Sequence, residues 1–156
     1  MPGGYETDTV TRLETNLDDC TAEQLGAAME KLLAAGALDV WFTPIQMKKH
    51  RPGTMLSVLC EPGDTDRLAD LIFAETTAFG LRRENLVRLK LARRFETVRT
   101  EFGEVTVKLG SKGDTLVQVA PEFESCRAAS ERAGVALRAV YEAALRAFSP
   151  PPAEKK

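Results

Sequence analysis

The sequence is poor in the side chains that transition-metal and nucleophilic sites use most. It contains one histidine, His50, and three cysteines that lie far apart, at Cys20, Cys60 and Cys126, with no Cys-x-x-Cys pair. Neither a zinc-type ligand spacing nor a Ser-His or Cys-His catalytic pair can be read from these positions. An odd number of scattered cysteines without a signal peptide predicts three free thiols and a cytoplasmic protein.

A long apolar run, a strong net charge and a Gly-rich phosphate loop are also missing. No apolar run approaches the ~20 residues of a membrane span. The formal net charge of -2 argues against a dedicated nucleic-acid binder, which is usually strongly basic. No Walker-type motif occurs. The 156 residues, 44% of them apolar, suit one domain or one domain with a small appendage, and are enough to bury a core.

Strand and helix patterns alternate along the first half of the chain. Apolar patterns predict strands over residues 10–17, 38–48, 54–60 and 81–91. One helix is predicted from a cap at Asp19 or Thr21 to Gly36, and a second from Asp64 or Thr65 to Gly80. The second helix would bury a stripe made of Leu68, Leu71, Ile72, Phe73 and Phe79. This β-α-β-β-α-β order predicts a ferredoxin-like α+β sandwich over residues 9–92, with both helices on one face of an antiparallel sheet.

The second half predicts a smaller appendage over residues 93–148. A β-hairpin over residues 94–109, a short strand over residues 115–120 and two helices over residues 122–132 and 137–148 follow from alternation, turn residues and helical spacing. Residues 1–8 are expected to be disordered. The Pro-rich, charged tail over residues 149–156 is expected to be disordered as well.

A cationic segment between two apolar strands is the most prominent feature of the first half. It reads Gln-Met-Lys-Lys-His-Arg-Pro-Gly-Thr over residues 46–54, and Pro52-Gly53 favours a turn. Lys48, Lys49 and Arg51 are therefore predicted at the tip of a rigid hairpin, where binding groups are often displayed. A simple solvated hairpin tip explains the same residues equally well.

Two further polar clusters could cooperate with this tip. Oxygen donors over residues 14–19, at the exit of the first strand, suit Mg²⁺ or Mn²⁺, although a helix N-cap accounts for Asp18 and Asp19 too. Residues 75–83 place two threonines at the exit of the second helix, next to Arg82. Their hydroxyls could bind phosphate oxygens, or the segment could be a helix end with arginines complementing the dipole. Together the clusters predict a site for an anionic ligand, such as a nucleotide, bridged by a hard cation.

Several segments in order resemble the C-terminal domain of the LarC nickel insertion proteins. They are Glu-Thr-Asn-Leu-Asp-Asp (14–19), Met-Glu-Lys-Leu-Leu-Ala-Ala-Gly-Ala-Leu-Asp-Val (29–40), Met-Lys-Lys-His-Arg-Pro-Gly-Thr (47–54), Glu-Thr-Thr-Ala-Phe-Gly-Leu-Arg-Arg (75–83) and Pro-Glu-Phe-Glu-Ser-Cys (121–126). The resemblance covers about residues 10–147 and rests on the order of these segments more than on any one of them.

The resemblance implies a function in the synthesis of the nickel-pincer nucleotide cofactor. The family inserts Ni²⁺ into pyridinium-3,5-bisthiocarboxylic acid mononucleotide and couples this lyase-type, chelatase-like reaction to CTP hydrolysis, with Mn²⁺ or Mg²⁺ on the nucleotide. The C-terminal domain looks like the CTP-binding part and assembles into homo-oligomers, expected to be trimers or hexamers. The substrate nickel is expected to be held mainly by a His-rich N-terminal domain that this chain does not include.

The family's roles, carried over by residue type, define the expected site. Lys48, Lys49, Arg51, Thr76, Thr77, Arg82 and Asn16 would bind the nucleotide, and Asp18 and Glu75 would bind the metal. No catalytic residue can be named, and His50 receives no role. The alternative is a non-catalytic oligomerisation or scaffold module that binds a protein partner, because a ferredoxin-like fold does not fix function.

Overall fold

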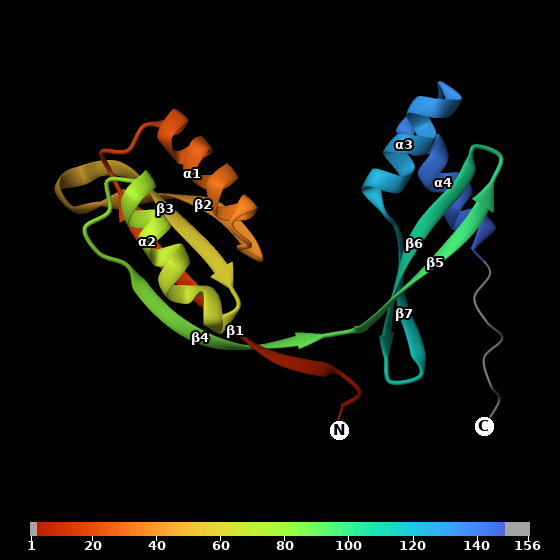
Figure 1. Ribbon diagram of the computed structural model, residues 1–156, viewed down its shortest axis with the longest axis horizontal. Coiled ribbons are helices and arrows are strands. Elements are labelled where there is room, and N and C mark those ends of the chain that lie inside the picture. The colour runs from red at the N-terminus through yellow and green to blue at the C-terminus, as the bar shows by residue number, and fades with distance from the viewer. Residues whose placement is uncertain (1–2, 149–156) are drawn as a thin grey trace. The chain divides into compact units, whose positions relative to one another are not determined.

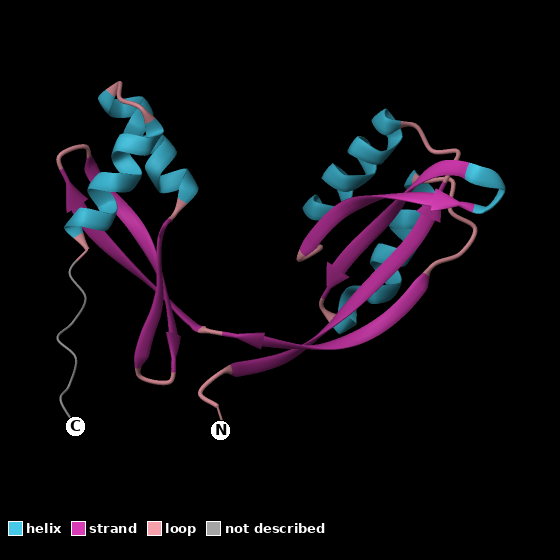
Figure 2. Cartoon of the chain, turned by 180° about the vertical axis from the view of Figure 1, so that it is seen from behind, coloured by secondary structure: helices cyan, strands magenta, loops and turns pink. Residues whose placement is uncertain are grey.

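The computed structural model describes residues 3–148, so the predicted tail over residues 149–156 lies outside the described residues. The chain divides into two compact units, each described here by itself. The first unit comprises Thr7–Arg88, and the second comprises Leu89 onward together with the residues up to Glu6. The elements of both units appear in Figure 1, and in Figure 2 from behind.

The first unit has the predicted ferredoxin-like order. Its elements are β1 (Glu6–Leu17), α1 (Ala22–Ala34), β2 (Asp39–Met47), a 3₁₀ turn (Lys48–His50), β3 (Arg51–Cys60), a second 3₁₀ turn (Pro62–Asp64), α2 (Thr65–Glu75) and β4 (Arg82–Lys90). The sheet order is β2-β3-β1-β4, and β3 is antiparallel to both of its neighbours. This is the split βαββαβ arrangement, so the predicted α+β class is confirmed. Both helices cover one face of the sheet (Figure 1).

The core of the first unit follows from strand alternation. Successive side chains of a strand point to opposite faces, so Leu13 and Leu17 of β1 share the helix-covered face, and Leu56 and Val58 of β3 join them in one buried cluster. The helices contribute their own apolar stripes, which include Leu25, Leu32, Leu68 and Ile72. Arg12, Glu14 and Asn16 alternate with these leucines and therefore lie on the opposite face.

Two boundaries differ from the prediction. β1 begins at Glu6, earlier than expected, so residues 6–8 are ordered strand; Asp8 is ion-paired to Arg88 at 2.7 Å. α2 ends at Glu75 and not at Gly80, because the backbone of Thr76 is already extended and its hydroxyl donates to the carbonyl of Ile72 at 2.7 Å. Local hydrogen bonding by a threonine competes with helix continuation.

Two residues of the predicted buried stripe of α2 are exposed: Phe79 lies beyond the early end of the helix, and Phe73 lies within the helix but outside its buried stripe. Leu68 and Ile72 are buried and Leu71 is partly buried, as expected. Phe73 is 43% exposed, however, and Phe79 is 103% exposed, in the loop that leads to β4. The prediction that Phe73 and Phe79 belong to the core was therefore wrong.

The second unit is a three-stranded antiparallel sheet with two helices. Its elements are β5 (Ala92–Thr100), β6 (Gly103–Lys112), β7 (Thr115–Pro121), α3 (Phe123–Ala133) and α4 (Leu137–Ala147), and the sheet order is β5-β6-β7. The helices pack on the face that carries Val98, Val105, Val107 and Leu109. α3 ends at Gly134, whose φ of 64° is the left-handed conformation that glycine favours.

The pairing of β6 with β7 contains one irregularity. Gly110 pairs with Gln118 but Ser111 pairs with Leu116, so Val117 is an extra residue in β7. This bulge changes which side chains of β7 face the core. Leu116 and Val119 both pack against it, although they are three residues apart, and Val117 is 52% exposed.

Across residues 3–148, every helix is too short or too polar to span a bilayer.

Candidate functional site

The predicted polar clusters of the first unit lie at the same end of its sheet. β1 ends where β3 begins, since Leu17 pairs with Thr54, and the side chain of Asn16 contacts Arg82 at the start of β4. The loop from β1 to α1, the hairpin between β2 and β3, and the loop from α2 to β4 therefore emerge together. The topology alone brings three segments, separated by about 30 residues each in the sequence, to one place.

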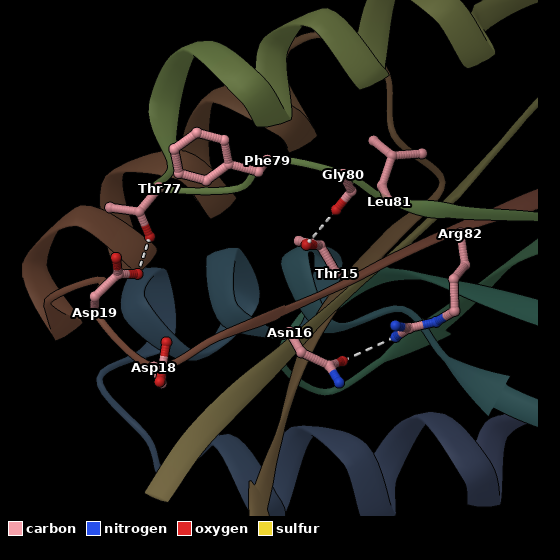
Figure 3. Close-up of a pocket in the computed structure, with 9 residues that line it drawn as sticks. All are labelled: Thr15, Asn16, Asp18, Asp19, Thr77, Phe79, Gly80, Leu81 and Arg82. Carbon is pink, nitrogen blue, oxygen red and sulfur yellow. Dashed lines mark hydrogen bonds between the residues drawn. The ribbon is translucent and has the colours of Figure 1, made fainter. Parts of the chain in front are cut away.

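A pocket of about 460 Å³ occupies this end of the sheet (Figure 3). This volume is within the range of small-molecule sites. The residues that line it come from the end of β1, the loop after it, and the loop before β4: Thr15, Asn16, Asp18, Asp19, Thr77, Phe79, Gly80, Leu81 and Arg82. Four of the residues predicted for the site are among them, namely Asn16, Asp18, Thr77 and Arg82.

Hydrogen bonds between segments hold the pocket together. The hydroxyl of Thr77 donates to Asp19 at 2.5 Å, and the hydroxyl of Thr15 donates to the carbonyl of Gly80 at 2.8 Å. Both bonds join the α2–β4 loop to β1 or to the loop that follows it (Figure 3). Because each bond connects positions at least 58 residues apart, the loop is fixed by tertiary contacts and not by its own sequence.

The hairpin tip is connected to the pocket through Arg51. Its guanidinium donates to the carboxylate of Asp18 at 3.2 Å. Lys48 and Lys49 are exposed in the adjacent 3₁₀ turn, and within residues 3–148 neither has an ion-pair partner. The turn is tight: Lys49 and His50 have φ values of 59° and 58°, a region that non-glycine residues seldom adopt.

Gly53 permits the close approach of this hairpin to β1. A Cβ atom at Gly53 would lie 2.9 Å from the backbone carbonyl of Leu17 and 2.6 Å from the sulfur of Met47. Only glycine fits there without displacing one of them.

Two residues predicted for the site contact other groups. The carboxylate of Glu75 accepts two bonds from Lys31, both of 2.7 Å, and does not line the pocket. Thr76 caps α2 and also accepts from the amide of Ala78, so its hydroxyl is committed to the backbone. Of the two residues predicted to bind the metal, Asp18 therefore lines the pocket and Glu75 lies outside it. Within residues 3–148 no group of three or more His, Cys, Asp or Glu could hold a metal by itself.

The oxygen atoms that remain at the pocket fit a different kind of cation site. Asp18 and Asp19 supply carboxylates at the rim and Asn16 an amide oxygen. Mg²⁺ and Mn²⁺ prefer such donors, and Mg²⁺ is commonly held by one or two carboxylates while ligand phosphates and waters complete its coordination. These residues fit a cation shared with a phosphate ligand.

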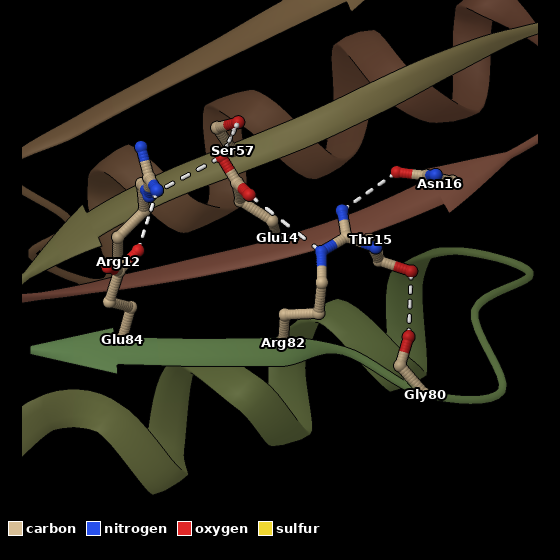
Figure 4. A network of polar contacts seen from close by, with 8 residues as sticks. All are labelled: Arg12, Glu14, Thr15, Asn16, Ser57, Gly80, Arg82 and Glu84. Carbon is tan, nitrogen blue, oxygen red and sulfur yellow. Dashed lines mark hydrogen bonds and ion pairs between the residues drawn. The ribbon is translucent and has the colours of Figure 1, made fainter. Parts of the chain in front are cut away.

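Arg82 belongs both to the pocket and to a charged network on the sheet face opposite the helices (Figure 4). It donates to Asn16 at 2.8 Å and lies 3.8 Å from Glu14. Glu14 is the centre of the network: it also lies 3.4 Å from Arg12 and accepts from the hydroxyl of Ser57 at 3.2 Å. Two neighbours on β1 thus orient the guanidinium of Arg82 at the edge of the pocket.

Asp19 belongs to the predicted oxygen-donor segment over residues 14–19 but was not named as a site residue, and the structure places it at the pocket. The cap of α1 is Thr21, whose hydroxyl accepts from the amide of Gln24 while the Gln24 side chain accepts from Thr21. The Thr-x-x-Gln spacing of this capping box is visible in the sequence and indicates Thr21, not Asp19, as the helix cap. Phe79 and Gly80 were missed because the helix was expected to continue to Gly80, and Leu81 was missed because it was assigned to the strand that follows.

The fold and the pocket define a two-unit α+β protein whose ferredoxin-like unit carries cations and hard oxygen donors at one end of its sheet. The chain belongs to the nickel insertion protein family, whose model matches residues 2–141. The resemblance predicted from the sequence is thereby confirmed.

The relatives with known names support this assignment. The chain is 49% identical over 143 residues to a putative nickel insertion protein of Syntrophotalea carbinolica, an overlap of 92% of this chain and 36% of that protein. It is 40% identical over 137 residues to the pyridinium-3,5-bisthiocarboxylic acid mononucleotide nickel insertion protein of Thermotoga sp. (strain RQ2), covering 88% of this chain and 34% of that protein. The chain thus spans about a third of the length of these relatives.

Two solved structures share the fold. One is the apo form of LarC2, the C-terminal domain of a cyclometallase involved in the synthesis of the NPN cofactor of lactate racemase. It matches with a TM-score of 0.86 and 45% identity, over 91% of this chain and 98% of that one. The other is a protein from Methanopyrus kandleri AV19, with a TM-score of 0.67 and 30% identity over 90% of this chain and 89% of that one.

Proposed function

We propose that this chain is the CTP-binding part of a nickel insertase. The whole enzyme would insert Ni²⁺ into pyridinium-3,5-bisthiocarboxylic acid mononucleotide, in a lyase-type reaction coupled to CTP hydrolysis, and so complete the nickel-pincer cofactor. The substrate nickel would be held mainly by a LarC-type N-terminal domain. We further propose that the chain works as a homo-oligomer, a trimer or hexamer, in the cytoplasm, where its three free cysteines would remain reduced.

One observation carries the nucleotide proposal: acids and bases that are far apart in the sequence meet at a single pocket. Arg82 lines it, and Arg51, paired with Asp18, connects it to the turn that carries Lys48 and Lys49. Arginine and lysine are the side chains that bind phosphate best. An oligomerisation module would have no need for this arrangement.

The two carboxylates of the pocket indicate that binding depends on a metal. Asp18 and Asp19 would repel a bare triphosphate, since like charges within a few ångströms oppose each other. A divalent cation held by these carboxylates would offset that repulsion. Asp18 and Asp19, with Asn16, would hold Mn²⁺ or Mg²⁺, which supplies charge neutralisation at the phosphates. Glu75 would take no part, because it lies outside the pocket lining, where it pairs with Lys31.

Calorimetric titration of CTP, with ATP as the comparison and Mn²⁺ present or absent, tests the proposal. We expect metal-dependent CTP binding that weakens on the order of tenfold or more in Lys48→Ala/Lys49→Ala, since charge-assisted contacts contribute roughly 1.5–3 kcal/mol each. Asp18→Asn should weaken the dependence on Mn²⁺, whereas Glu75→Gln, its matched control, should not. A folded protein that binds no CTP at millimolar concentration would contradict the proposal and favour the scaffold module.

A further inference from the structure

Phe79 is the large apolar side chain with the highest exposed fraction in the part of the chain that the structure describes, at 103%. The other exposed aromatic rings of the first unit and the second are less than two-thirds exposed. Leaving a phenylalanine in water forgoes the stabilisation that burial of this side chain gives. Exposure of one ring is not evidence of binding by itself, but Phe79 also lines the pocket, where a ligand would cover it.

The loop that carries Phe79 is held on both sides of the ring. Two residues before it, Thr77 donates to Asp19, and one residue after it, the carbonyl of Gly80 accepts from Thr15. Thr76 also accepts from the amide of Ala78 at 3.2 Å. A ring on a loop fixed in this way is presented to its ligand without a further loss of backbone freedom on binding.

The ring stands at the rim of the pocket. Phe79 lines the cavity from the α2–β4 loop and Arg82 lines it from the start of β4, with Gly80 and Leu81 between them in the sequence (Figure 3). The lining of the pocket thus includes one apolar, planar group together with a cation and oxygen donors. A ligand that matches this set has a flat ring at one end and an anionic, metal-binding group at the other.

We infer that Phe79 is the stacking platform for the base of the bound nucleotide. This inference rests on the proposed function, because it names the part of the same ligand that Phe79 would contact. Stacking of a base on an aromatic side chain tolerates any base, since every base has a π-face. Phe79 therefore contributes affinity for nucleotides in general and positions the base, while the choice of cytosine comes from other groups.

The test separates the base from the phosphates. Titrations in Mn²⁺ would compare CTP, ATP and inorganic tripolyphosphate, which has the phosphates and no base, on the wild type and on Phe79→Ala, Phe79→Leu and Phe79→Trp. We expect Phe79→Ala to weaken CTP and ATP about tenfold to a hundredfold and to leave tripolyphosphate unchanged. Phe79→Leu, apolar but not aromatic, should lose nearly as much, and Phe79→Trp should bind at least as tightly as the wild type.

Three outcomes would overturn the inference, and they are distinguishable from one another. Equal CTP affinity in the wild type and Phe79→Ala would show that the ring does not contact the base. An equal loss for CTP and tripolyphosphate would show that Phe79 supports the anion site and not the base. A wild type that binds neither ligand would refute the proposed function, and the inference with it. Phe79 is fully exposed, so its replacement should leave the fold intact, which circular dichroism would verify.

Discussion

Replacing Glu14 by alanine should destabilise the first unit more than its position on a sheet surface would imply. The Glu14 side chain is only 17% exposed and accepts a hydrogen bond from Ser57, which is completely buried. Without Glu14 the Ser57 hydroxyl has no partner, at a cost of roughly 1–3 kcal/mol. The ion pairs with Arg12 and Arg82 add less, about 0–1 kcal/mol each, because those guanidinium groups are 34% and 55% exposed.

The expected loss is therefore about 1–5 kcal/mol in the free energy of unfolding. The matched control is Glu84→Ala, which removes a 57% exposed carboxylate that contacts Arg12 in the same network and should cost less than about 1 kcal/mol. Urea unfolding followed by tryptophan fluorescence measures both. Trp41 is the only tryptophan of the chain and pairs with Ser57 across β2 and β3, so it reports on this unit.

A double-mutant cycle identifies the cause of the loss. If the buried hydroxyl is responsible, Ser57→Ala should be much less damaging in the Glu14→Ala background than in the wild type, with a coupling energy of about 0.5–3 kcal/mol. Equal losses for Glu14→Ala and Glu84→Ala, or additive effects of Glu14→Ala and Ser57→Ala, would refute this reasoning.

Three further predictions concern cysteine chemistry and chain packing. Burial raises the pKa of the Cys60 thiol above its ordinary value of 9.0, so the unfolded chain releases this proton at a lower pH than the native protein does. The free energy of unfolding should therefore fall as the pH rises past about 9. A Cys60→Ser variant should show a shallower fall, and an equal dependence of stability on pH in the two proteins would contradict the role of Cys60. With a thiol reagent, partly exposed Cys20 should react in the native protein and Cys60 only after unfolding; rapid native labelling of Cys60 would contradict its burial. Gly53→Ala should cost about 1–3 kcal/mol by overpacking, measured by urea unfolding. Gly63→Ala, where a Cβ meets nothing within 4 Å, is its control, and equal losses would rule out the clash as the cause.

The order of elements in the first unit could be predicted from the sequence because each strand and helix has its own local signal. Alternation identifies strands, Thr21 and Gly36 mark the ends of α1, and the βαββαβ order then fixes which segments share a sheet end. The meeting of Asn16, Asp18 and Arg82 follows from that topology. This meeting can therefore be predicted without knowledge of the side-chain contacts.

The details of the site could not be predicted, because they depend on contacts between distant residues. No feature of the local sequence distinguishes Glu75 from Asp18 as a pocket residue. Glu75 pairs instead with Lys31 on α1, which is distant in the sequence. The early end of α2 could not be predicted for the same reason, because Thr77 gains its hydrogen bond to Asp19 only outside the helix. Phe79 looked like a core residue because a phenylalanine usually is one.

The bulge at Val117 has a consequence for association between molecules. β7 is at the edge of the second sheet, and an edge strand exposes unpaired amide and carbonyl groups that can recruit a strand from another chain. The extra residue interrupts the regular repeat of these groups and increases the local twist, so a straight foreign strand cannot pair along the whole of β7. The irregularity therefore protects this edge against aggregation. Removing Val117 would leave Leu116 opposite Ser111 and facing the core, and it would restore a continuous, regularly spaced edge.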